Sequence, residues 1–129
     1  MRDAFELFNA DRIGHGVRVV EDPATMALAR ERVAAFEVCV TSNYQTGVTP
    51  AATVHPLMKM LQAGINVTIC SDDPSISQIT LTDEYHRVCE DMDLSQPKLK
   101  ERILAAARAA FLPEQERQKL VDELKLELI

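Results

Sequence analysis

The chain has 129 residues, of which 47% are hydrophobic and 26% are charged, and its formal net charge is −6. This size and composition are typical of one soluble globular segment and exclude a disordered or fibrous protein. The acidic balance, with Lys and Arg scattered among acids at helical spacing, argues against a nucleic-acid-binding surface.

No apolar stretch of the sequence approaches the ~20 residues that a membrane span needs. The first residues, MRDAFELFNADR, are amphipathic and too acidic for a signal or transit peptide. The three cysteines, Cys39, Cys70 and Cys89, are an odd number and form no CxxC pair. We therefore expect reduced thiols in a cytoplasmic protein, without a thiolate zinc site.

The first half of the chain alternates between two kinds of pattern. Short, nearly continuous apolar runs rich in β-branched residues predict buried strands, and longer runs with helical spacing predict helices. This alternation is typical of βαβ units in a parallel sheet, so we expect the α/β class. The strands are expected at 12–16, 35–43 and 66–73, and the helices at 22–36 and 50–64.

The remaining residues predict helices only. The segment 80–92 opens with Thr80 and has Asp83 three residues later, which is a capping box. Ser95 is the expected N-cap of a helix over 95–111, and Pro113 lies near the start of the last helix, over 112–129. We treat residues 1–129 as a single segment.

Polar side chains follow all three predicted strands. His15 ends the first strand, Ser42 and Asn43 end the second, and Asp72 and Asp73 end the third. Ligands of parallel α/β folds gather at the carboxyl ends of the strands. An imidazole, a hydroxyl–amide pair and two carboxylates at one edge predict a metal or acid–base site.

Each of these residues also has a purely structural explanation. A histidine between two glycines occurs in turns, where a hydrogen bond satisfies it. An Asp-Asp-Pro sequence is a common turn and N-cap composition, and Ser-Asn is ordinary loop chemistry. The residues alone leave both explanations open. A magnesium or phosphate site at Asp72 and Asp73 is a weaker possibility, because no glycine-rich phosphate loop accompanies them.

An ordered set of motifs resembles the adenosine deaminase family over nearly the whole chain. The motifs RIGHG and SDDP carry most of the resemblance. The set consists of RIGHG (12–16), EVCVTSNYQTG (37–47), HPLMKMLQAG (55–64), SDDP (71–74), EY (84–85) and FLPEQERQKL (111–120).

This resemblance implies a (β/α)₈ TIM barrel of the amidohydrolase type with one catalytic zinc ion per complete site. In that family zinc activates a water, which attacks C6 of the purine; ammonia leaves, and adenosine or deoxyadenosine becomes inosine or its deoxy form. By resemblance, Asp72 ligates the zinc, Asp73 hydrogen-bonds a nitrogen of the five-membered ring, and His15 orients the attacking hydroxide. The partner is a small-molecule purine nucleoside.

Two motifs of the family pattern do not occur in this sequence: a His-x-His pair and a His-Ala-Gly-Glu motif. We interpret the two other histidines, His55 and His86, as structural or surface residues. We therefore expect the C-terminal portion of the barrel, about three of its eight βα units, followed by C-terminal helices. Such a segment is expected to be inactive alone.

Two alternatives remain open. The substrate of the complete enzyme could be another 6-aminopurine, such as adenine or AMP. Alternatively, the chain is a non-catalytic fragment that associates with another chain, or with itself through an exposed barrel face.

Overall fold

The computed structural model describes residues 1–50 and 53–128. Twelve elements are described within these residues. In chain order they are α1 (Arg2–Glu6), β1 (Arg12–Gly14), the 3₁₀-helix η1 (Val17–Glu21), α2 (Pro23–Glu31), β2 (Ala35–Val38), α3 (Val40–Gln45), α4 (Leu57–Gln62), β3 (Asn66–Ile69), α5 (Pro74–Ser77), α6 (Leu81–Glu90), α7 (Gln96–Arg108) and α8 (Glu114–Glu127).

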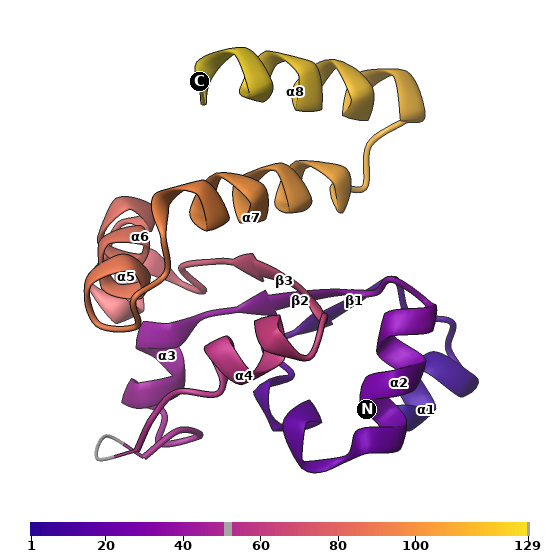
Figure 1. Cartoon of the computed structure of the whole chain (residues 1–129), viewed down its shortest axis with the longest axis vertical. Helices are drawn as coiled ribbons and strands as arrows, with labels where there is room; N and C mark the ends of the chain where they lie inside the picture. Colours follow the sequence, from indigo (N-terminus) through magenta and orange to yellow (C-terminus); the bar gives the residue numbers. More distant parts are fainter. Residues whose placement is uncertain (51–52, 129) are drawn as a thin grey trace.

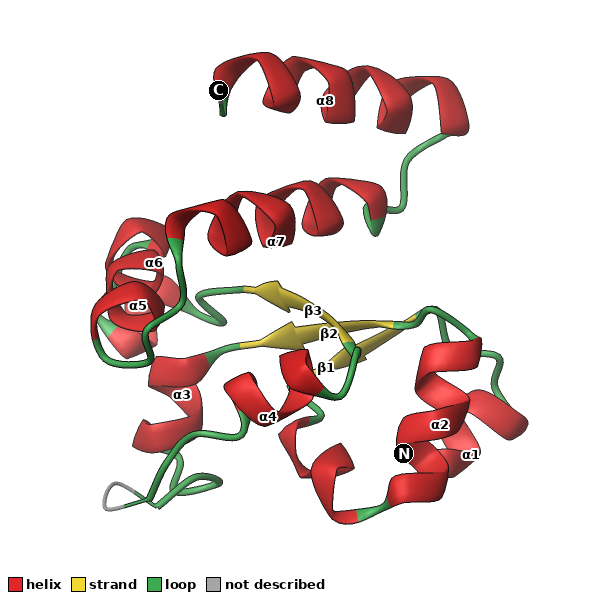
Figure 2. Ribbon diagram, in the orientation of Figure 1, coloured by secondary structure: helices red, strands yellow, loops and turns green. Residues whose placement is uncertain are grey.

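The three strands form one parallel sheet in the order β1-β2-β3. In the register, Ile13 pairs with Phe36, and Phe36 pairs with Val67. Helices α1, α2 and α4 lie on one side of the sheet, while α7 runs along the edge strand β3 and α8 packs on α7 (Figure 1). The predicted α/β class with parallel strands is confirmed, and the strand arrowheads point toward α3 and α5 (Figure 2).

The hydrophobic core lies between the sheet and the helices α1, α2 and α4. Phe36 and Val38 of β2 and Val67 of β3 are fully buried, together with Phe5 of α1. Burying a side chain of this size stabilises the fold by about 1.5–3 kcal/mol. Leu57 and Met60 of α4 complete the same cluster. The core therefore fixes the strands, and with them the residues that follow the strands.

All three strands are shorter than predicted. Strand β1 stops at Gly14, before His15, and β3 stops at Ile69, before Asp72 and Asp73. The largest correction concerns the second strand, which was expected to end at Ser42 and Asn43. Strand β2 stops at Val38, and residues 40–45 form the short helix α3. The β-branched residues Val40 and Thr41 favour a strand. Tertiary contacts override that preference, because Val40 is fully buried and the backbone N–H of Thr41 donates to a carboxylate of α6.

The helix predicted over 50–64 begins only at Leu57. Residue His55 precedes Pro56, and a residue before proline is disfavoured in the helical conformation. The part of this prediction at residues 51–52 lies outside the described residues. At the other end, the prediction of a glycine C-cap is confirmed: Gly64 follows the last helical turn with φ 74°.

The other predicted helices are present, with shorter bounds. Helix α2 ends at Glu31 because the chain must enter β2 at Ala35. The capping box of Thr80 and Asp83 at the start of α6 is confirmed. Ser95 occupies the N-cap position of α7, but its side chain makes no capping hydrogen bond. Residue 129, the end of the last predicted helix, lies outside the described residues.

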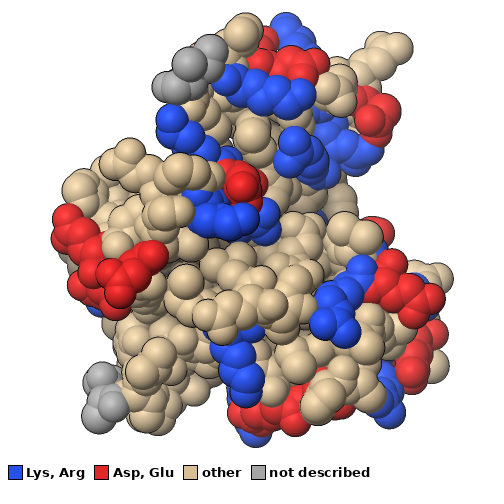
Figure 3. Space-filling view, viewed as in Figure 1, with Lys and Arg blue, Asp and Glu red and all other residues tan. Residues whose placement is uncertain are grey.

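The charged residues on the face seen in Figure 3 are interspersed. Lys and Arg side chains lie beside Asp and Glu side chains over α7 and α8, and a wide uncharged area covers the middle of this face (Figure 3). Among the described residues, no helix combines the length and the apolar character that crossing a membrane requires.

Candidate functional site at the carboxyl ends of the strands

His15 and Asp72 approach each other beyond the carboxyl ends of β1 and β3. His15 follows β1 directly, and its backbone N–H donates to the carbonyl of Glu37 at 2.9 Å, which continues the sheet. Its Nε2 lies 3.6 Å from Oδ2 of Asp72. The two side chains are 41% and 42% exposed. A ligand can therefore reach both of them.

Both residues have unusual backbone conformations. The φ angle is 54° at His15 and 61° at Asp72, in the left-handed region that residues other than glycine rarely occupy. Such a conformation costs on the order of 1–3 kcal/mol, and four other non-glycine residues of the chain, Asn9, Val33, Gln78 and Asp93, also have it. At both strand ends the strained backbone turns a polar side chain toward the same place.

The structure explains why the second glycine of the RIGHG motif, Gly16, is a glycine. Its φ is 64°, and an added Cβ would lie 2.6 Å from an atom of the Phe36 ring. No larger residue fits there without moving the core. Gly16 therefore lets the chain turn away from the sheet directly after His15.

Ser42 and Asn43 of α3 lie between the other two strand ends. Ser42 Oγ donates to Oδ2 of Asp72 at 2.7 Å, and Asn43 Nδ2 lies 3.2 Å from Nδ1 of His15. Ser42 is 5% exposed and Asn43 is 1% exposed. The structure therefore brings together the polar residues that follow all three strands, although Ser42 and Asn43 reach this place from a helix.

Asp73 has a different position from its neighbour Asp72. Its Oδ1 accepts hydrogen bonds from the backbone N–H groups of Ser75 and Ile76, at 3.0 and 3.2 Å, and it caps α5. The turn chemistry considered for Asp-Asp-Pro is thus present at Asp73. At Asp72 the carboxylate contacts His15 and Ser42 instead.

Glu84 of α6 is a buried acid whose position the sequence reasoning did not predict. It is fully buried and accepts hydrogen bonds from the backbone N–H of Thr41, at 3.0 Å, and from its hydroxyl. This contact fixes α6 to the start of α3, the helix that carries Ser42 and Asn43. The sequence could have indicated this burial. Glu84 lies four residues before Val88, and residues with this spacing share one face of a helix.

His55 and His86 occupy the positions expected of structural and surface residues. His55 is 3% exposed, and its Nε2 lies 3.0 Å from Oδ1 of Asn43. Burial lowers the pKa of His55 to about 4. His86 lies on the exposed surface of α6, within 3.3 Å of Glu90. All three cysteines are free thiols in the structure.

The residues at the strand ends fit part of a zinc site. Zinc in hydrolytic enzymes takes nitrogen and oxygen ligands, and the carboxylate of Asp72 is a suitable oxygen donor. Within the described part of the chain, no group of three or more His, Cys, Asp or Glu residues is close enough to hold a metal ion. The described residues therefore do not form a complete metal site by themselves.

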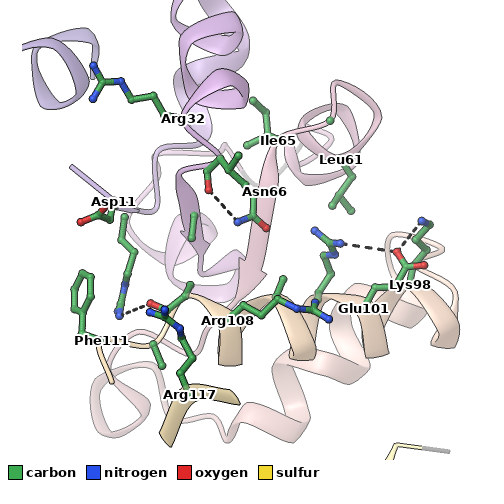
Figure 4. A pocket seen from close by; sticks show the side chains of 18 residues that line it. Asp11, Arg32, Leu61, Ile65, Asn66, Lys98, Glu101, Arg108, Phe111 and Arg117 are labelled. Carbon is green, nitrogen blue, oxygen red and sulfur yellow. Dashed lines mark hydrogen bonds and ion pairs between the residues drawn. The ribbon is translucent and has the colours of Figure 1, made fainter. Parts of the chain in front are cut away.

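A separate hollow of about 730 Å³ lies at the opposite end of the strands (Figure 4). It is lined by the first residues of the strands and by basic side chains of α7, among others. Several of the charged side chains around it are paired, because Arg12 forms an ion pair with Glu37 and Lys98 forms one with Glu101. We place the candidate site at the carboxyl ends, where the polar residues converge, and not in this hollow.

A parallel α/β sheet with polar residues gathered beyond the carboxyl ends of its strands is the arrangement of α/β proteins that bind ligands at this edge. The chain belongs to the adenosine deaminase family, because the model of that family, described as "Adenosine deaminase", matches residues 1–126. The resemblance of the motifs is thereby confirmed.

Two relatives illustrate the match. The chain is 37% identical over 122 residues to the adenosine deaminase of Serratia proteamaculans, which covers 95% of this chain and 37% of that protein. It is also 37% identical over 122 residues to the adenine deaminase of Rhizobium leguminosarum. That match covers 95% of this chain and 38% of the relative. The chain thus spans little more than a third of the length of these relatives.

Solved structures show the same fold. The adenine deaminase of Arthrobacter aurescens superposes with a TM-score of 0.90 at 25% identity, over 98% of this chain and 39% of that one. A zinc-bound amidohydrolase from Burkholderia ambifaria superposes with a TM-score of 0.82 at 23% identity. The match covers 98% of this chain and 38% of that one. The expected fold, a portion of a TIM barrel with C-terminal helices, is confirmed.

Proposed function

We propose that this chain forms one part of the active site of a zinc-dependent deaminase. With water, the complete enzyme converts adenosine to inosine, or deoxyadenosine to deoxyinosine, and releases ammonia. The observation that carries the proposal is the approach of His15 Nε2 to Asp72 Oδ2, at 3.6 Å, beyond two parallel strands of a chain from this family. Both side chains are open to a ligand, and both have strained backbones.

In this proposal Asp72 is a zinc ligand. Ser42 supports the role, because its hydroxyl donates to Oδ2 of Asp72 and fixes the orientation of the carboxylate. When bound, zinc supplies a hydroxide at neutral pH by lowering the pKa of its water. Asp72 contributes the negative charge that favours the cation at this strand end.

His15 is proposed to orient and stabilise the oxygen that attacks C6 of the purine. The left-handed backbone at His15 and the hydrogen bond from Asn43 hold the ring with Nε2 toward Asp72. Nε2 of His15 lies 3.6 Å from Oδ2 of Asp72, so with zinc held by Asp72 this imidazole would be the group that hydrogen-bonds the attacking oxygen.

Asp73 is proposed to hydrogen-bond a nitrogen of the five-membered ring of the purine. Its Oδ1 accepts the two backbone N–H groups that begin α5, so the cap fixes the direction of the side chain. The adjacent aspartates then serve different partners: Asp72 serves the metal and Asp73 serves the base. The cytoplasmic location expected from the three free thiols belongs to the same proposal.

A hybrid enzyme tests the proposal. Residues 1–126 of this chain replace the matching part of the Serratia proteamaculans adenosine deaminase, and the hybrid is assayed with adenosine, deoxyadenosine, adenine and AMP. We expect turnover of adenosine and deoxyadenosine by the hybrid, and none by the chain alone. A folded, zinc-loaded hybrid that prefers AMP or adenine would contradict the adenosine assignment.

The non-catalytic alternative predicts a different result. Strands β1 and β3 form the two edges of the sheet, and an edge strand can pair with another chain. Sedimentation of the purified chain at several concentrations measures self-association. A folded hybrid without activity toward any of the four purines would favour this alternative.

A further inference from the structure

A chain of hydrogen bonds runs from the backbone of α4 to His15. The N–H of Leu57 lies 3.0 Å from Nδ1 of His55, and Nε2 of His55 lies 3.0 Å from Oδ1 of Asn43. The Nδ2 of Asn43 then lies 3.2 Å from Nδ1 of His15. His55 is 3% exposed and Asn43 is 1% exposed, so bulk water does not compete for these contacts.

The first contact determines which nitrogen of His55 carries the proton. A backbone N–H can only donate, so Nδ1 of His55 must accept with its lone pair. The buried ring remains neutral at pH 7, because burial lowers its pKa to about 4. A neutral imidazole with a lone pair on Nδ1 carries its proton on Nε2. His55 is therefore a donor toward Asn43.

The second contact determines the orientation of the Asn43 amide. Its Oδ1 can only accept, and it faces the protonated Nε2 of His55. The NH₂ group of Asn43 then faces His15, and an amide NH₂ can only donate. Nδ1 of His15 must accept and carries no proton, so the ring proton is on Nε2. That nitrogen is the one that faces Asp72.

We propose that His55 is a positioning residue that, through Asn43, holds His15 in the tautomer with the proton on Nε2. This inference rests on the proposed function, in which Nε2 of His15 faces the metal and the attacking oxygen. An Nε2–H group donates to an oxygen at that place, whereas the other tautomer would direct a lone pair at a carboxylate. His55 touches neither metal nor substrate and acts only through Asn43.

The tautomer of His15 can be measured without zinc, substrate or turnover. In the ¹⁵N-labelled chain, long-range ¹H–¹⁵N correlation distinguishes a protonated ring nitrogen from one with a lone pair. We expect the Nε2–H form of His15 in about tenfold excess or more over the Nδ1–H form. A predominant Nδ1–H form would overturn the proposal, and this readout is independent of the hybrid's activity.

Three variants test the path of the effect. Asn43→Asp keeps the shape of the side chain but replaces the donor with an acceptor, so we expect the proton of His15 to move to Nδ1. His55→Ala removes the donor to Asn43 and is expected to reduce the tautomer excess. His55→Gln supplies an amide donor in its place and is expected to restore it. If the excess persists in both Asn43→Asp and His55→Ala, the proposal is wrong.

Discussion

Nε2 of His15 lies 3.6 Å from Oδ2 of Asp72, and both residues have φ angles in the left-handed region, 54° and 61°. They are not neighbours in the sheet, because β2 lies between the strands that they follow. The contact therefore depends on two strained strand ends that bend across the end of β2. Ser42, from α3, holds the same oxygen of Asp72 and stabilises this arrangement.

The first prediction concerns Gly16, which lets the chain turn after His15. Gly16→Ala introduces a Cβ that would lie 2.6 Å from the Phe36 ring, at a φ of 64°. We expect it to lower the free energy of unfolding by about 1–3 kcal/mol or more. The matched control is Gly14→Ala, where an added Cβ has nothing within 4 Å. Urea denaturation followed by circular dichroism measures both; equal losses in the two variants would contradict the packing argument.

A second prediction concerns Glu84, whose carboxylate accepts hydrogen bonds from the backbone N–H and from the hydroxyl of Thr41. Glu84→Gln places an amide in a fully buried position that requires only acceptors. We expect a loss of about 2–4 kcal/mol in the free energy of unfolding, because a buried donor then lacks a partner. Glu90→Gln, on the exposed side of the same helix, is the control and should change stability by less than about 0.5 kcal/mol. A small effect at Glu84 would show that the Thr41 contact does not hold α6.

The third prediction is a pH dependence of stability that comes from His55. Its pKa is about 4 in the folded chain, compared with about 6.5 for an unperturbed histidine. Between these values the unfolded chain binds the additional proton, so stability falls as the pH falls. The contribution lost between about pH 6.5 and pH 4 is about 3 kcal/mol.

His55→Gln isolates this contribution, because it keeps an amide donor toward Asn43 but cannot titrate. The difference in unfolding free energy between the chain and this variant should shrink or reverse as the pH is lowered from 7 to 4. A difference that stays constant over this range would mean that His55 does not titrate with a lowered pKa.

Much of the fold was predictable because the strands and helices have clear periodic patterns. The runs around Ile13, Phe36 and Val67 are short and rich in apolar residues, which is typical of strands in a parallel sheet. The helix α3 could not be predicted, because Val40 and Thr41 favour a strand by local preference. A contact with Glu84, distant in the sequence, decides the conformation instead.

The candidate site was predictable in its members but not in its geometry. His15, Asp72 and Asp73 were recognisable as polar residues after predicted strands and by their motifs. The Asp-Asp-Pro sequence indicated a turn or N-cap, but it did not indicate which aspartate caps α5 and which contacts His15. The role of His55 was equally hidden, since its hydrogen bond to Asn43 depends on how α4 packs against α3.

The most direct test of the central claim is the zinc content and adenosine turnover of the hybrid enzyme with Asp72→Ala or Asp73→Ala. The two adjacent aspartates are matched controls for each other. We expect Asp72→Ala to lose zinc and turnover together, because the metal loses a carboxylate ligand. We expect Asp73→Ala to keep its zinc and to lose activity mainly through a higher KM or lower kcat/KM for adenosine. A zinc-loaded and active Asp72→Ala hybrid would contradict the account.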